Sequence, residues 1–80
     1  MKTFLLIHSH LESECATAFA AWSGVSSPLR GGDAWAGCAH GDHQVFWQVE
    51  AADEAAALAL LPAFVAARTA VVPVRPAPIP

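Results

Sequence analysis

The chain has little positive charge and no long apolar segment. Four lysine and arginine residues stand against seven aspartate and glutamate residues, which gives a formal net charge of −3. Proteins that bind nucleic acid need clustered cations to meet the phosphates, and no such cluster occurs. The apolar stretch of residues 55–67 contains Pro62 and falls short of the roughly 18 residues that a membrane-spanning helix requires. We therefore expect neither a nucleic-acid partner nor a membrane span.

The N-terminus lacks the features of a secretory signal. The apolar run Phe4–Ile7 is shorter than the hydrophobic region of a signal peptide, and no small-residue cleavage site follows it. We therefore expect a cytoplasmic protein whose two cysteines are reduced. A disulfide between Cys15 and Cys38 remains an alternative if the fold brings them close enough.

Several catalytic signatures are also missing. Tyrosine, a common acid in active sites, does not occur. There is no Gly-x-Ser-x-Gly nucleophile motif. The paired glycines Gly31 and Gly32 precede a predicted strand instead of following one, so they do not form a phosphate-binding loop. These absences favour a non-catalytic binding protein over an enzyme.

The length predicts a single domain spanning residues 1–80, with residues 76–80 as an extended proline-rich tail. A domain of 80 residues buries a modest fraction of its surface and often depends on a partner, a metal or a disulfide. Hydrophobic residues make up 55% of the chain and charged residues only 14%, so some apolar surface must be covered. The composition therefore predicts association with a second copy of the chain.

The pattern of apolar residues predicts the order strand, helix, strand, strand, helix, strand. The expected segments are a strand over 3–8, a helix capped at Ser9 or Ser13 and ended by Gly24, strands over 34–39 and 43–49, a helix from Asp53 and a strand over 71–75. Residues 40–42 form the hairpin connection between the middle strands. Pro62 interrupts the second helix, and Pro73 confines the last strand to a sheet edge.

This order predicts an α+β fold of the ferredoxin-like type, with a four-stranded antiparallel sheet and two helices on one face. The first and third strands are expected at its centre. The opposite face carries Phe4 or Leu5, Trp35, and Phe46 or Trp47, depending on register. That face is too apolar for water, so we expect a homodimer that packs sheet against sheet.

All histidines and cysteines fall in two stretches, residues 8–15 and 38–43, and the predicted fold gathers both at one rim of the sheet. Imidazole and thiol groups are ligands for borderline transition metals, so the sequence predicts a site for nickel, copper or zinc. The candidate ligands are His8, His10, His40, His43, Cys15 and Cys38. His8 and His10 project to the same face of a strand and are expected to bind the ion together. Ordinary core packing of the cysteines and solvation of the histidines near the hairpin remain open alternatives.

A second reading is a small enzyme or ligand carrier. An apolar molecule would then occupy a pocket lined by four aromatic residues, Trp22, Trp35, Phe46 and Trp47. His8 or His10 would act as acid or base. Metal analysis of protein purified without a histidine tag separates this reading from metal binding.

The element order, the length and the His8-Ser9-His10 ending of the first strand resemble small bacterial dimeric α+β-barrel proteins. This group includes ferredoxin-like nickel-binding proteins of actinobacteria, together with small monooxygenases and lactone isomerases. The resemblance implies a homodimer, with metal binding at a surface or rim in some members and a cavity between helices and sheet in others.

Overall fold

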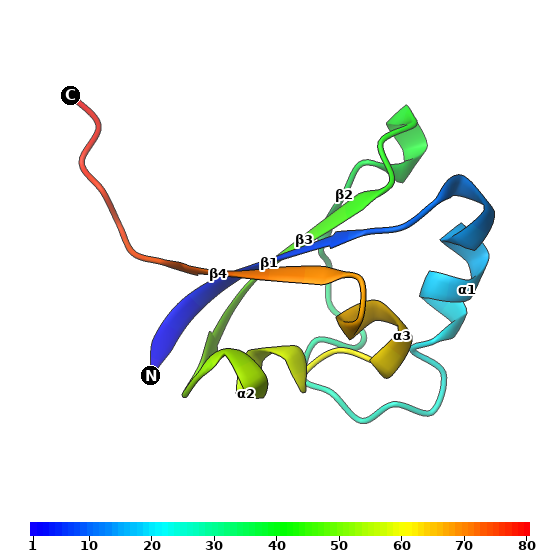
Figure 1. Ribbon diagram of the computed structural model, residues 1–80, viewed down its shortest axis with the longest axis horizontal. Coiled ribbons are helices and arrows are strands. Elements are labelled where there is room, and N and C mark those ends of the chain that lie inside the picture. The colour runs from blue at the N-terminus through cyan, green and yellow to red at the C-terminus, as the bar shows by residue number, and fades with distance from the viewer.

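The computed structural model describes residues 1–80 as a small α+β fold on one four-stranded antiparallel sheet (Figure 1). Its strands are β1 (Lys2–Ser9), β2 (Trp35–Ala36), β3 (Gln44–Ala51) and β4 (Thr69–Val74). Its helical segments are the 3₁₀ turns η1 (Glu12–Glu14) and η2 (Cys38–His40) and the α-helices α1 (Cys15–Ala20), α2 (Glu54–Leu58) and α3 (Ala63–Ala66). The strand order β2-β3-β1-β4 places β1 and β3 at the centre of the sheet.

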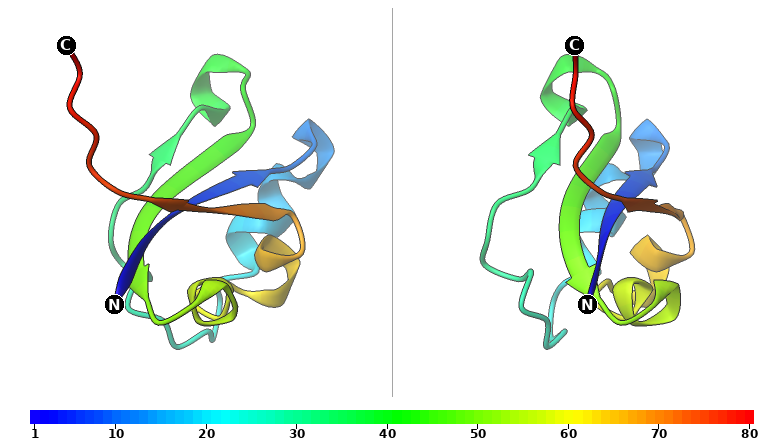
Figure 2. Two further views of the ribbon diagram at one scale, coloured as in Figure 1. Left: turned by 60° about the vertical axis from the view of Figure 1, so that its left-hand side comes forward. Right: turned by 90° about the vertical axis from the view of Figure 1, so that its left-hand side faces the viewer.

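Alternate residues of β1 carry the core. Phe4, Leu6 and His8 are at most 2% exposed, and Phe4 and Leu6 pack with Ala57, Leu61 and Val65 from the helical side. The helices α1, α2 and α3 lie on that one side of the sheet (Figure 2). Burial of a leucine such as Leu6 contributes about 1.5–3 kcal/mol to folding. The buried apolar cluster consists of Phe4, Leu6, Val49, Ala51, Ala57, Leu61 and Val65. This cluster is small, so burial of apolar side chains contributes only a modest free energy of folding.

The first helix is shorter than the sequence predicts. The chain makes the turn η1 and then only six residues of α1. The expected serine cap is wrong, because the backbone N–H of Leu11 donates to the Glu14 carboxylate at 3.0 Å instead. Leu11 and Phe19, expected on the buried stripe, are 68% and 54% exposed, and Ala18 is the buried residue of α1. A helix of fewer than two turns cannot bury a stripe that spans three.

The predicted strand over 34–39 is reduced to the two residues of β2. Beyond Ala36 the chain turns sharply, because the backbone of Gly37 approaches that of Asp42 so closely that a Cβ on Gly37 would lie 2.5 Å from the Asp42 carbonyl oxygen. Cys38 to His40 form η2, and Gly41 closes the turn with a φ of +81°. The connection to β3 is therefore a folded loop instead of a three-residue hairpin turn.

The second helix behaves as its sequence predicts. The Asp53 carboxylate accepts a hydrogen bond from the backbone N–H of Ala56 at 2.8 Å, which caps α2. The interruption at Pro62 is confirmed, because α2 ends at Leu58 and α3 begins at Ala63. Proline lacks an N–H and fixes its own φ, so the helix restarts after it.

The Asp53 cap gives a direct test of this end of the fold. We expect Asp53→Ala to lower the free energy of unfolding by about 1 kcal/mol, because the N–H of Ala56 loses its acceptor. Urea denaturation measures the change, and Asp53→Asn, which keeps an acceptor, should retain most of the stability. Equal losses in the two variants would show that the carboxylate does not act as a cap.

The last strand lies at an edge, in agreement with the expectation from Pro73. β4 pairs with β1 alone, and Pro73 lies opposite Phe4. Residues 75–80 continue away from the sheet without helix or strand (Figure 1). The longest helix has six residues, and none is long and apolar enough to cross a membrane.

The face of the sheet away from the helices has no covering element and is apolar over one part, while Gln48 and Glu50 of β3 make the rest polar. It carries Leu5 and Ile7 of β1, Phe46 of β3 and Val72 of β4, which is 39% exposed. Trp35 lies opposite Phe46 in the β2–β3 ladder and is 83% exposed.

The aromatic pocket predicted from the sequence does not form from its four expected residues. Trp22 and Trp47 pack against each other on the helix side of the sheet, with ring centroids 5.8 Å apart. Trp35 and Phe46 lie on the other face, because they alternate with the inward residues of their strands. Phe46 and Trp47 are neighbours on β3, so their side chains project to opposite faces of the sheet and cannot line one pocket. Which of the two faces the helices depends on strand register, and the sequence pattern leaves that register open.

Candidate metal centre

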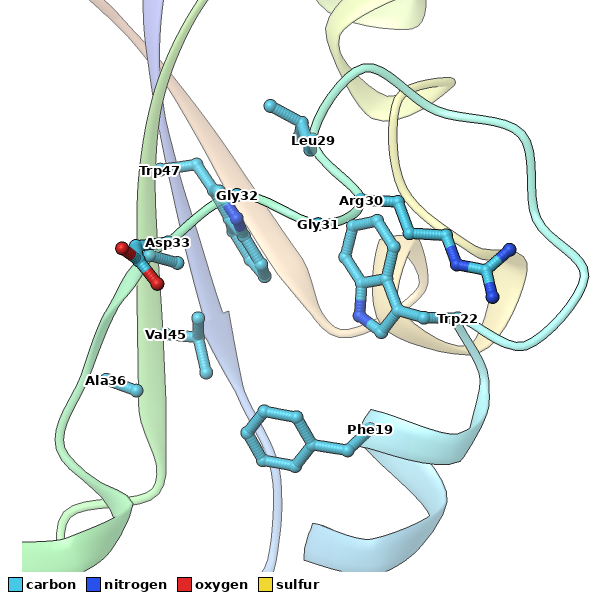
Figure 3. A pocket seen from close by; sticks show the side chains of 11 residues that line it. Phe19, Trp22, Leu29, Arg30, Gly31, Gly32, Asp33, Ala36, Val45 and Trp47 are labelled. Atoms are coloured by element: carbon cyan, nitrogen blue, oxygen red, sulfur yellow. The ribbon is translucent and has the colours of Figure 1, made fainter.

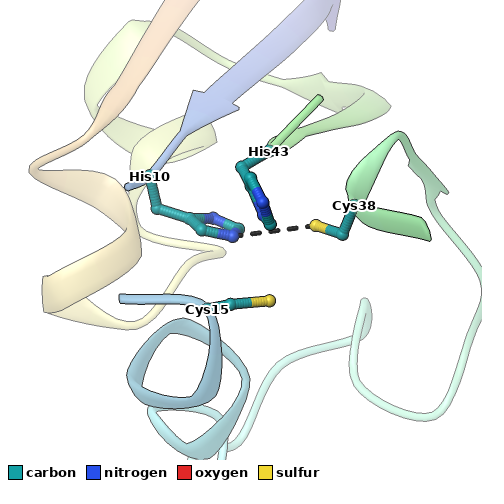
Figure 4. A group of neighbouring side chains, drawn as sticks. All are labelled: His10, Cys15, Cys38 and His43. Atoms are coloured by element: carbon teal, nitrogen blue, oxygen red, sulfur yellow. Dashed lines mark hydrogen bonds between the residues drawn. The ribbon is translucent and has the colours of Figure 1, made fainter. Parts of the chain in front are cut away.

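Four side chains meet at the rim where β1 ends. His10 follows β1, Cys15 begins α1, Cys38 begins η2 and His43 precedes β3. One ligand atom from each residue can be chosen so that all four lie within 4.8 Å of one another. Figure 4 shows the two imidazoles and the two thiol groups directed toward a common space. The predicted convergence of the two His- and Cys-bearing stretches at one rim is therefore present.

Backbone hydrogen bonds hold the four residues in place. The N–H of His10 donates to the carbonyl of His43 at 3.1 Å, which continues the β1–β3 ladder one step beyond Ser9 and Gln44. The ring centroids of His10 and His43 lie 5.3 Å apart as a result. The N–H of Gly37 donates to the carbonyl of Gln44 at 3.0 Å, which returns Cys38 toward the same rim.

The donor set is largely shielded from solvent. His10 is 8% exposed, while Cys15, Cys38 and His43 are half-buried. The Nδ1 atom of His43 is buried and has no hydrogen-bond partner in the chain. A buried polar atom without a partner costs about 1–3 kcal/mol, so a partner from outside the chain would stabilise it.

The spacing of the donors suits a tetrahedral ion. In a zinc site with Zn–S near 2.3 Å and Zn–N near 2.05 Å, donor atoms lie about 3.3–3.8 Å apart. The Cys38 Sγ and His10 Nε2 atoms are 3.7 Å apart, which already matches. The widest pairs of donor atoms, at up to 4.8 Å, need to close by about 1 Å.

Cys15 and Cys38 are both free thiols, so no disulfide joins them. They lie in short helical segments outside the sheet.

His8 lies behind His10 instead of beside it. Its Nδ1 atom is 3.2 Å from the carbonyl oxygen of Val65, and its Nε2 atom is 2.9 Å from His10 Nδ1. A carbonyl only accepts, so His8 carries its proton on Nδ1 and its Nε2 accepts the N–H of His10 Nδ1. This assignment leaves the lone pair of His10 on Nε2, the atom that faces Cys38.

Burial reinforces this arrangement. Removal from water is the main cause that lowers the pKa of His8, and the nearby His10 lowers it further, although the hydrogen bond to Val65 opposes the shift. His8 is therefore neutral at pH 7, and its unprotonated Nε2 can accept a hydrogen bond.

Burial also raises the pKa of the Cys38 thiol, and the adjacent Cys15 thiol adds to the increase. A metal ion must displace the thiol protons as it binds.

The structure thus brings four of the six candidate ligands together and leaves two apart. His8, expected to bind the ion jointly with His10, instead hydrogen-bonds to the far side of the His10 ring. His40 is exposed on η2 and is not part of the group. The Val65 carbonyl, which fixes the orientation of His8, carries no sequence signal because every residue has a carbonyl.

Comparison with protein-family models, with curated proteins and with solved structures finds no match to this chain. The functional argument therefore depends on the geometry of the rim.

Proposed function

We propose that the protein binds one zinc ion through His10, Cys15, Cys38 and His43. The observation that carries this proposal is the convergence of two imidazoles and two thiols from four segments of the chain to within 4.8 Å. Two thiolates and two imidazoles favour a tetrahedral ion, and zinc takes this geometry readily. Nickel and copper(II) prefer square-planar or tetragonal surroundings, so of the three metals considered zinc fits best.

The site is non-catalytic in this proposal. Four protein ligands fill a tetrahedral shell and leave no position for water or substrate, which is the pattern of structural zinc sites. The ion would join the end of β1, the start of α1 and the loop before β3. A small domain gains most from such a link, because its core supplies little stability by itself.

Calorimetric titration of the reduced protein, purified without a histidine tag, tests this function. We expect one zinc ion per chain, with release of protons from the thiols on binding. Cobalt(II) offers a second readout, because tetrahedral thiolate coordination gives intense visible absorption. Cys38→Ser should abolish both signals, whereas His40→Ala should leave them unchanged. Zinc binding no tighter than about 1 mM, or loss of binding in His40→Ala, would overturn the proposal.

We also propose that the fold is ferredoxin-like and that a second copy covers the open face of the sheet. The order of helices and strands and the central position of β1 and β3 support the first part. The exposure of Val72 and Trp35 beside Phe46 on a face without helices supports the second.

Assembly can be tested directly. We expect a dimer at micromolar concentration in size-exclusion chromatography with light scattering, and a shift to monomer in Phe46→Glu, because a charge would be buried between the sheets. Glu54→Gln, an exposed position at the start of α2 on the helix side of the sheet, serves as the control and should remain dimeric. A wild-type mass of 8.4 kDa throughout the micromolar range would contradict the proposal.

A further inference from the structure

A second site, separate from the four candidate metal ligands, lies between β3 and the segment that leads into β2. It is a cavity of about 360 Å³, walled by Phe19 and Trp22, by Val45 and Trp47 of β3, and by residues 29–34 (Figure 3). Binding sites for small molecules commonly have about 300–1,000 Å³. The cavity contains none of the four candidate metal ligands.

The cavity stays open because β2 is so short. Its two residues pair with Val45 and Phe46, and the ladder ends there. The preceding segment turns at Gly31, with a φ of +84°, and no strand pairs with Trp47 on that side of β3. The edge of β3 beside Trp47 is therefore uncovered, and the Trp47 indole, which packs against Trp22, also lines the cavity.

The walls are mostly apolar, and two indole N–H groups among the lining side chains are free to donate. The Nε1–H groups of Trp22 and Trp47 have no hydrogen-bond partner in the chain, and both indole rings border the same space (Figure 3). The two charged residues of the rim point away from it: Arg30 donates to the carbonyl of Val25 at 3.3 Å, and the Asp33 carboxylate turns outward (Figure 3). An occupant would thus meet mainly aromatic and aliphatic surface, with the two charged groups directed away from it.

We propose that this cavity binds a neutral, planar aromatic molecule that carries a carbonyl oxygen. The indole rings of Trp22 and Trp47 meet at 47°, which leaves ring faces against which a flat molecule can pack. A carbonyl oxygen accepts from an indole N–H, whereas a hydrocarbon offers those donors no acceptor. Phe19, 54% exposed, gains a partner when the cavity is filled. The inference does not depend on the zinc site.

Two matched probes test the proposal. 2-Acetonaphthone carries a carbonyl group, and 2-ethylnaphthalene has the same ring system without an acceptor. Equilibrium dialysis against the full chain, with zinc and separately with a chelator, gives the dissociation constant of each. We expect 2-acetonaphthone to bind with a constant on the order of 100 µM and more tightly than 2-ethylnaphthalene.

Tryptophan variants then locate the contact. Trp22→Phe and Trp47→Phe keep an aromatic wall but remove the N–H donor. At least one of them should weaken 2-acetonaphthone by about threefold to tenfold relative to 2-ethylnaphthalene. Trp35→Phe is the matched control, because Trp35 is 83% exposed on the opposite face, and its probe affinities should stay unchanged.

Three results would overturn the proposal: binding weaker than about 1 mM for both probes, equal affinity of the two probes in the wild type, or an equal effect of Trp35→Phe and the cavity variants. If the wild-type chain binds no zinc but still prefers 2-acetonaphthone, the result refutes the proposed metal function and leaves the cavity proposal standing.

Discussion

Removal of zinc is expected to lower the midpoint of thermal unfolding by about 10–20 °C. A ligand present at 100 times its dissociation constant stabilises the folded state by about 2.7 kcal/mol, provided that the unfolded chain does not bind it. In a domain of this size each kcal/mol shifts the midpoint by about 4–8 °C. The ion would connect the ends of β1 and β3 to α1 and η2.

The matched variants separate the metal from the side chains. Cys38→Ser keeps the size of the residue but removes a thiolate ligand, so the variant should unfold at the same temperature with zinc or with a chelator. His40→Ala changes an exposed imidazole on the same turn and should keep the full zinc-dependent shift. Thermal scans followed by circular dichroism give all three midpoints. A wild-type midpoint that does not respond to zinc would exclude a stabilising metal.

The sequence predicted the sheet because its signals are local. The run Phe4–Ile7 and the alternation over Val45–Val49 describe strands without reference to the rest of the chain. Pro62 and Pro73 acted through covalent constraints that tertiary structure cannot remove, so the helix restart and the edge strand follow from them directly.

Other parts of the fold depend on contacts that no local pattern reveals. Residues 34–39 have the composition of a strand, but the close approach of Gly37 to Asp42 turns the chain into η2. Phe19 and Leu11 have helical spacing, but α1 is too short to bury both. In each case tertiary geometry overrides a reasonable local preference.

The candidate site was predictable to the level of its rim but not of its ligands. Topology alone brings residues 8–10, 15 and 38–43 to one edge, and the structure shows them there. The choice between His8 and His10 depends on the ring nitrogens. His8 is separated from the thiols by the His10 ring, with which it shares a 2.9 Å hydrogen bond. Neither that contact nor the Val65 carbonyl behind it has a sequence signature.

His8 is expected to control zinc affinity without binding the ion. Its Nε2 accepts the Nδ1–H of His10, which holds the lone pair of His10 on Nε2. Residues that orient a metal ligand in this way typically change affinity by about 10–100-fold when they are replaced. We therefore expect His8→Phe, which fills the same space without an acceptor, to weaken zinc binding by about that factor.

His8→Gln sharpens the test, because its amide oxygen can accept from His10 and should recover part of the lost affinity. Competition with a chromophoric chelator measures the affinities. Nitrogen-15 NMR of the histidine rings gives an independent readout: His10 should keep its proton on Nδ1 in the wild type and in His8→Gln, but populate both tautomers in zinc-free His8→Phe. A purely structural role for His8 would alter stability without changing that tautomer balance. Zinc affinity equal to wild type in a folded His8→Phe would show that the hydrogen bond between the two histidines has no part in metal binding.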